Sequence, residues 1–202
     1  MNLFQLKSKP NGTERLPLFL KENFIAIGWP GIGNLTNVDS DEIEYRLAQA
    51  YKSYTGQTMA YHKGMVNAFV NTMQPLDIVM ITEGDYVHIG QVGEYYYEEK
   101  YDNDIDGMCH RRSVEWLATV ERNHLNEKVR EHLKNRATIT KFKYPFALAE
   151  IEPYILGQSD LNATNSPKGE IFEKAWDVLV KSLDSEDEQT RVLAASAIWQ
   201  SK

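Results

Sequence analysis

Asp85, Glu98 and Lys100 are the residues in this sequence that come nearest to a catalytic set. Two carboxylates and a lysine can hold a magnesium ion and activate a water molecule, which is the chemistry of a metal-dependent nuclease. Glu98 and Lys100 open an acidic loop, however, where solvated charge is the common explanation. We therefore expect a protein that is not an enzyme, with nuclease activity as a distant alternative.

Other catalytic motifs fail on spacing. The glycine-containing run 28–33 lacks the phosphate-loop pattern, and the proline within it spoils a dinucleotide fingerprint. Cys109 and His110 are neighbours in a predicted strand, so they point to opposite faces and make a poor nucleophile and base. His124 and His132 lie two helical turns apart, too far for one ion. The sequence predicts no cofactor and no metal site.

A basic stretch stands out on an acidic chain. The 202 residues carry a formal net charge of −7, which argues against a nucleic-acid partner. Within 108–144, nine Lys and Arg residues face four Asp and Glu residues, whereas after Ile151 nine acids face five bases. This local excess permits phosphate contacts, and a solvated face of mixed charge is the alternative interpretation.

The composition is that of a globular protein with a substantial core, because 42% of residues are hydrophobic and 25% are charged. The lone Cys109 excludes a disulfide framework and fits a reducing compartment. No signal peptide and no apolar run of membrane-spanning length is found, so we expect a cytoplasmic protein with no membrane partner.

Two helices are predicted between the first strand and a central hairpin. Residues 24–29 form a short run of strand formers, which is stopped by proline and glycine. Asp39 or Ser40 caps a helical pattern. A second helix is predicted over 59–73, and Pro75 ends it.

After Pro75 the hydrophobic period becomes that of strands. The predicted elements are a strand at 78–81, a turn at 83–85, its partner strand from 86 to 97, an alternating strand at 109–117, a helix at 123–136 and a last strand at 138–142. Short, non-adjacent strands with helices inserted early favour an α+β fold, in which a closed or nearly closed β-barrel is flanked by helices.

The domain organisation is predicted from the change in pattern after this barrel. We expect a barrel domain at 1–145, a connector at 146–165 and a helical hairpin at 166–202. Ser166 and Pro167 begin its first helix, and Ser185 with Glu188 forms a capping box for the second. The hairpin either caps the barrel by packing or serves as a docking surface for a partner protein.

Five segments in order carry a family resemblance: Ile-Ala-Ile-Gly-Trp-Pro at 25–30, the helical insertion, Asp-Ile-Val at 77–79, His-Ile-Gly-Gln-Val-Gly-Glu-Tyr-Tyr-Tyr at 88–97, and His-Arg-Arg-Ser-Val-Glu-Trp-Leu at 110–117. In these segments the chain resembles the EVE branch of the PUA-like superfamily. It is most similar to the specificity domains of modification-dependent restriction systems. The resemblance covers roughly residues 1–145.

This resemblance implies a barrel whose aromatic pocket accepts a base rotated out of its stack. The unstacking cost is recovered by stacking on aromatic rings and by hydrogen bonds to the polar edge of the base. The candidate pocket residues are Trp29, Phe69, Tyr95, Tyr96, Tyr97, His110 and Trp116, and alternation lets at most two of the three tyrosines share a face. The candidate phosphate contacts are Arg111, Arg112, Lys128, Arg136 and Lys141.

Several of these residues have a structural alternative. Trp116 and Phe69 fit a core position better than a pocket, Trp29 fits either, and His110 can bond a base edge or satisfy the end of a strand. The tyrosines are expected to be mixed, with one buried and one exposed.

Two classes of function remain open. The first is a reader of a modified base in nucleic acid, with DNA favoured over RNA, in a restriction or defence context. Such systems normally carry an effector domain after the specificity domain, where this sequence has only the helical hairpin, so in a defence context either the reader recruits its effector in trans or the chain is a fragment of a larger machine. The second is a protein-interaction or small-ligand module that uses the same pocket. The position of the basic stretch discriminates between them, because it favours the reader if it lies at the mouth of the pocket.

Overall fold

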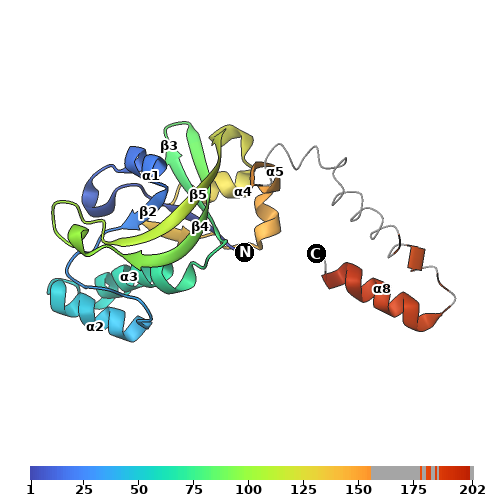
Figure 1. Ribbon diagram of the computed structural model, residues 1–202, viewed down its shortest axis with the longest axis horizontal. Helices are drawn as coiled ribbons and strands as arrows, with labels where there is room; N and C mark the ends of the chain where they lie inside the picture. Colours follow the sequence, from blue (N-terminus) through green and yellow to red (C-terminus); the bar gives the residue numbers. More distant parts are fainter. Residues whose placement is uncertain (156–177, 179–180, 183–184, 186, 201–202) are drawn as a thin grey trace. The chain divides into compact units, whose positions relative to one another are not determined.

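The computed structural model describes residues 1–155, 178, 181, 182, 185 and 187–200 (Figure 1). The chain divides into two compact units, Met1–Ile155 and Leu156–Lys202. In the second unit, α8 (Glu188–Gln200) corresponds to the second helix of the predicted hairpin. The Asp187 carboxylate accepts the backbone N–H of Thr190 at its start, so Asp187 rather than Ser185 caps the helix. The predicted first helix lies outside the described residues.

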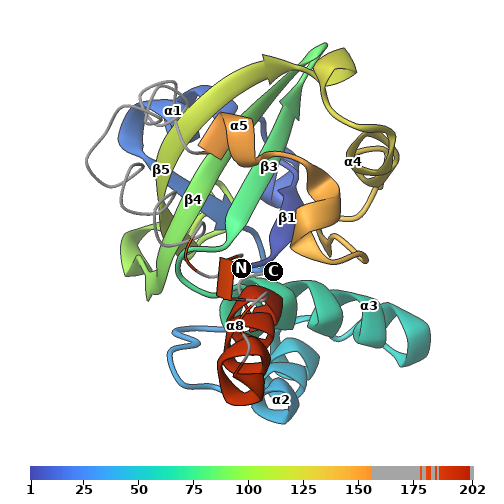
Figure 2. The same cartoon turned by 90° about the vertical axis from the view of Figure 1, so that its right-hand side faces the viewer.

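The first unit has the predicted α+β class and is built on one mixed sheet of six strands (Figures 1 and 2). The strands are β1 (Leu3–Leu6), β2 (Phe24–Ile27), β3 (Ile78–Glu83), β4 (Tyr86–Tyr97), β5 (His110–Glu121) and β6 (Ile139–Lys141). Their order across the sheet is β2-β5-β4-β3-β1-β6. β1 and β3 run parallel and the other neighbours are antiparallel.

The sheet is open, so of the two predicted forms, a closed or a nearly closed barrel, the closed one is wrong. β2 and β6 are its two edge strands, and among the described residues no backbone pairing joins them. These edges have only four and three residues, and β6 packs beside the helical segment 68–72 instead of reaching β2. A sheet closes into a barrel only when its edge strands pair along their length, which these two short strands do not do.

Helices cover both faces of the sheet. They are α1 (Leu16–Glu22), α2 (Ser40–Ala50), α3 (Gly56–Asn67), α4 (Glu127–His132) and α5 (Glu152–Ile155), with a π-helical turn, η2 (Ala68–Thr72), that continues α3. Single 3₁₀ turns lie at Pro10–Gly12, Glu99–Tyr101, Arg122–His124 and Phe146–Ala149. α2 and α3 lie side by side, away from α4 and α5 (Figures 1 and 2).

Because both faces are covered, the first unit has two apolar cores. On β3, Val79 and Ile81 join the core beneath α1, α2 and α3, whereas Ile78 and Met80 join the core beneath α4 and α5. Alternate residues of a strand point to opposite faces, so a strand buried on both sides must be apolar throughout. This explains the uninterrupted run at 78–81.

Several boundaries differ from those predicted. β1 and α1 were not expected, and α3 begins at Gly56 rather than at Met59. Ala149 and Ile151 are buried in the second core, so the packed unit extends past the boundary predicted at residue 145. Within the described ranges, no helix has both the length and the apolar character that a membrane span requires.

Candidate functional site

Four aromatic side chains gather where β2 ends. Trp29 follows β2, Tyr51 and Tyr54 follow α2, and His62 lies on α3. The rings of Tyr54 and His62 are stacked with centroids 3.9 Å apart, and Tyr51 stacks on Tyr54 at 4.8 Å. The Trp29 indole N–H donates to Nδ1 of His62 over 3.3 Å. The result is a continuous, half-buried aromatic cluster drawn from three segments of the chain.

These rings form one wall of a hollow of about 220 Å³, which we call the aromatic pocket. The turn Lys9–Gly12, together with Gly28 and Thr138, completes the lining. Drug-sized ligands occupy pockets of about 300–1,000 Å³. The aromatic pocket is therefore suited to a single planar ring system rather than to a large ligand.

Trp29 adopts a left-handed backbone conformation, with φ of 68°. A bulky residue rarely takes this conformation, which costs on the order of 1–3 kcal/mol and persists only where the surroundings impose it. Two hydrogen bonds constrain the backbone that follows its Cα: His110 donates to the carbonyl of Trp29, and the N–H of Gly31 donates to Asp102. The fold thus holds the indole in place at a cost in stability.

A chain of hydrogen bonds through His110 and Tyr95 fixes the carbonyl of Trp29. His110 is buried, and its Nε2 lies 3.3 Å from that carbonyl oxygen, while its Nδ1 lies 2.9 Å from the Tyr95 hydroxyl. Because a carbonyl only accepts, Nε2 carries the proton and Nδ1 accepts from Tyr95. Tyr95 in turn accepts the backbone N–H of Leu35 at 3.2 Å. Burial lowers the pKa of His110 to about 4, which keeps it neutral.

Asp102 holds the next turn. Its carboxylate accepts the Gly31 backbone N–H at 2.6 Å, the Tyr97 hydroxyl at 2.5 Å and the Cys109 thiol at 3.5 Å. Burial opposes its ionisation, but these donors outweigh that effect and hold the pKa of Asp102 below its usual value. Burial and the neighbouring Asp102 raise the pKa of Cys109 to about 12, so its thiol is not a nucleophile at neutral pH.

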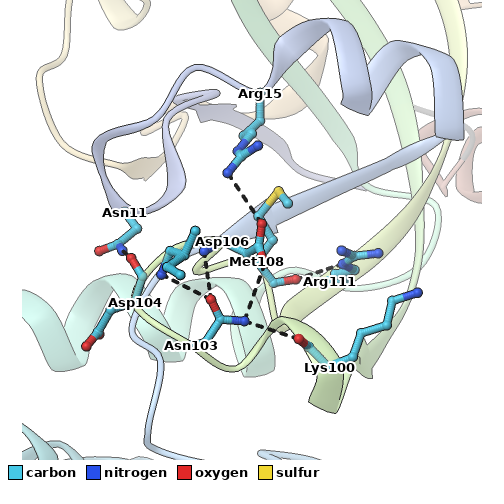
Figure 3. A network of polar contacts seen from close by, with 9 residues as sticks. Asn11, Arg15, Lys100, Asn103, Asp104, Asp106, Met108 and Arg111 are labelled. Atoms are coloured by element: carbon cyan, nitrogen blue, oxygen red, sulfur yellow. Dashed lines mark hydrogen bonds and ion pairs between the residues drawn. The ribbon is translucent and has the colours of Figure 1, made fainter.

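The acidic loop that carries Asp102 also contacts the turn Lys9–Gly12, through Asn11 (Figure 3). The Asn11 side-chain amide donates to the carbonyl of Asp104, and Arg15 pairs with Asp106 at 3.7 Å. Asn103 braces the loop itself by accepting the backbone N–H groups of residues 105 and 106. One loop therefore contacts both the turn after Trp29, through Asp102 and Gly31, and the turn Lys9–Gly12, through Asp104 and Asn11.

The structure brings together four of the predicted pocket residues, Trp29, Tyr95, Tyr97 and His110. Trp29 lines the pocket, whereas the other three do not. His110 and Tyr95 hold the carbonyl of Trp29, and Tyr97 bonds Asp102, which holds Gly31. Tyr96 points to the opposite face of β4 and is 37% exposed. In the strand register it lies opposite Arg111 of β5. The expectation that at most two of the three tyrosines share a face is confirmed.

Arg111 and Arg112 are not at the surface, so their predicted role as phosphate contacts is wrong. The Arg112 side chain is buried and donates to the carbonyls of Phe69, Val70, Met73 and Gly93 at 2.6–2.9 Å. The carbonyls of Phe69, Val70 and Met73 lie at the C-terminal end of the α3–η2 segment, where the helix supplies no further backbone N–H donors. The Arg111 guanidinium lies between the rings of Phe24 and Tyr101, at 4.2 and 4.1 Å from their centroids.

Phe69 and Trp116 do not reach the aromatic pocket either. Phe69 is fully buried in η2, where its carbonyl receives Arg112. Trp116 is partly buried and donates its indole N–H to the carbonyl of Phe19 at 3.1 Å, which ties α1 to the sheet. Both residues take the core position that was weighed as the alternative to the pocket.

The remaining predicted basic residues line two larger hollows. Arg136 lines one of about 710 Å³ together with Lys7, Lys9 and Lys134. Lys128 and Lys141 line another of about 1,040 Å³ beside α4 and β6. The first hollow shares Lys9 and Thr138 with the aromatic pocket, and the second shares Lys134 and Asn135 with the first.

The residues of the nuclease alternative are not brought together. Asp85 lies in the turn before β4 and Glu98 follows its far end, so the twelve-residue strand separates them. At about 3.4 Å per residue, that separation exceeds what one metal ion can bridge. In the part of the chain that the structure describes, no three His, Cys, Asp or Glu side chains gather as a metal site.

Sequence reasoning missed Tyr51, Tyr54 and His62. In the sequence these residues lie in or just after helices, at spacings typical of side chains that pack in a core. Only the folded chain places them beside Trp29. The signal available was local: two tyrosines three residues apart in the polar link between two predicted helices.

The fold and the pocket define a small α+β domain with an aromatic site beside basic hollows. The chain belongs to a family described as a domain of unknown function, DUF8426, whose model matches residues 6–143. The match contains every residue that lines the aromatic pocket. A comparison with curated proteins found no match.

Proposed function

We propose that this protein is a non-catalytic reader that binds nucleic acid and takes one base, a modified one by preference, into the aromatic pocket. The observation that carries the proposal is the pocket itself: a space for one planar ring system, walled by Trp29, Tyr51, Tyr54 and His62. A base is the planar aromatic group that such a wall stacks. Stacking on an aromatic side chain contributes about 1–3 kcal/mol per base.

The pocket also offers polar groups for the edge of a base. Because the Trp29 indole N–H donates to Nδ1 of His62, the neutral imidazole carries its proton on Nε2. Burial lowers the pKa of His62, so this neutral form prevails at neutral pH. Thr138, which also lines the pocket, adds a polar group. Such groups distinguish one base from another, which stacking alone does not.

Basic side chains next to the pocket favour nucleic acid over a free small ligand. Lys9 lines both the aromatic pocket and the hollow that contains Arg136. Lys134 and Arg136 of the basic stretch line this neighbouring hollow and not the pocket itself, and Arg111 and Arg112 are buried. A base with its phosphates attached uses both features, whereas a free ligand needs only the first.

We propose further that the fold is a PUA-like domain of the EVE type with an open sheet. The segments that carry the resemblance fall on β2, β3, β4 and β5 in the same order, with α2 and α3 inserted after β2. The lining of the pocket by Trp29, after one edge strand, and Thr138, before the other, indicates a sheet that curls towards closure.

Replacing Tyr54 or Trp29 with alanine is expected to weaken oligonucleotide binding by about 5- to 150-fold. Trp29 is lost as a stacking surface, and Tyr54, whose ring stacks on both Tyr51 and His62, is lost as the ring that holds these two in place. Binding is measured by fluorescence polarisation with matched oligonucleotides that carry or lack N6-methyladenine or 5-methylcytosine, in DNA and in RNA. Preference for one modification, lost in these variants, is the expected result.

Tyr45→Ala is the matched control, since Tyr45 is a tyrosine of α2 that is 60% exposed and lies outside the pocket lining. Tyr54→Phe should retain binding, because it keeps the ring. Binding of a free nucleoside but of no oligonucleotide would assign a small-ligand module instead. Full binding by both alanine variants would disprove base reading in this pocket.

A further inference from the structure

A basic groove runs away from the aromatic pocket. It is the hollow of about 710 Å³, and its cations are Lys7 and Lys9 after β1 and Lys134 and Arg136 before β6. Lys9 and Thr138 line both the groove and the aromatic pocket, so the two are neighbours. A chain whose base sits on Trp29 would leave the pocket directly into this groove.

The charges in the groove are available to an anion. Among the described residues, Lys7 and Arg136 form no ion pair within 4 Å, and Lys9 has only an exposed contact with Glu14 at 3.8 Å. Lys134 pairs with Glu131 on the exposed surface of α4. Such exposed pairs contribute little and are easily exchanged for a phosphate.

The two acidic residues of the groove are already engaged by the protein. Glu83 bonds Nε2 of His88 at 2.9 Å, and Glu14 accepts the backbone N–H groups of Arg15 and Leu16 at 3.0 Å. Lys7 has a lowered pKa, because it is partly buried and lies near the charge of Arg122. Cations crowded in this way are relieved by a bound anion.

We infer that the ligand is a single-stranded nucleic acid whose base enters the aromatic pocket and whose flanking phosphates lie on Lys7, Lys9, Lys134 and Arg136. The inference rests on the proposed function and adds the form of the substrate and the path of its backbone. A basic groove that leads to aromatic stacking surfaces is the arrangement that suits single strands.

Charge decides between a single strand and a duplex. Flipping a base out of a duplex costs a few kcal/mol, which phosphate contacts must help to recover. The groove holds four cations and two acids, and the whole chain is acidic. This small excess adds little to the stacking energy of about 1–3 kcal/mol per base that must offset duplex opening, whereas a single strand presents a base that is already free to rotate.

The test compares a short fluorescent DNA single strand with the same sequence as a duplex, at about 50 to about 200 mM NaCl. The single strand should bind at least several-fold more tightly. Each phosphate contact contributes about 0.7 to the slope of log K against log salt. Lys9→Ala/Arg136→Ala should therefore make the slope shallower by about 1.4, and Lys7→Ala by about 0.7.

Two variants separate this inference from the proposed function. Tyr54→Ala should weaken binding without changing the salt slope, and Lys21→Ala, an exposed lysine of α1 outside the groove, should change neither. Equal or tighter binding of the duplex, or an unchanged slope in the groove variants, would overturn the inference while base reading stood. If the groove variants lose binding and Tyr54→Ala does not, the pocket proposal fails instead.

Discussion

Replacing Arg112 with alanine is expected to lower the free energy of unfolding by about 3–5 kcal/mol, because a buried polar network loses its only charged member. The guanidinium of Arg112 donates to four backbone carbonyls, three from the end of the α3–η2 segment and one from β4. Removing it leaves these acceptors buried without donors. Urea unfolding at neutral pH measures the loss.

Lysine at this position should recover only part of the stability, since one ammonium cannot reproduce the planar fork that reaches four acceptors. Arg136→Ala is the matched control, because Arg136 is exposed, and its replacement should change stability by no more than about 0.5 kcal/mol. An Arg112→Ala protein that unfolds like the wild type but loses nucleic-acid binding would instead restore the phosphate role.

Local patterns predicted the parts of the fold that local interactions determine. The run at 78–81, the turn beginning at Glu83 and the alternation along β5 all appear where the sequence places them. β1 escaped prediction because Leu3–Leu6 is short, is buried on both faces and pairs in parallel with β3, some 75 residues away. The open edges of the sheet were not predicted for a related reason, since the pairing of edge strands depends on tertiary packing.

The candidate site divides in the same way. Alternation correctly placed Tyr95 and Tyr97 on one face and Tyr96 on the other. The count of charged residues predicted that Arg111 and Arg112 are exposed to solvent. A sequence shows how many cations there are and not which of them are buried. The carbonyls that Arg112 satisfies lie about 20 to 40 residues away along the chain. Only the three-dimensional arrangement reveals that this arginine of β5 caps the C-terminal carbonyls of the α3–η2 segment.

Acid should destabilise the protein through His110. Its pKa is about 4 in the folded state, against about 6.5 in an unfolded chain. Between these values the unfolded state binds a proton that the folded state does not, so stability falls as the pH falls. The contribution of His110 is unchanged above pH 6.5, declines between pH 6.5 and 4, and reaches a loss of about 3 kcal/mol.

His110→Gln provides the comparison, because an amide cannot titrate but can still donate to the carbonyl of Trp29. His62 and His132, whose pKa values burial also lowers, and Asp102, which faces His110, are present in both proteins. Their effects cancel in the difference, except for the part of the lowered Asp102 pKa that the charge of His110 itself causes. Urea unfolding between about pH 7 and about pH 4 should show the wild type losing stability more steeply than the variant. Parallel curves would mean that His110 is not the buried neutral support of Trp29, and the strained turn would then need another explanation.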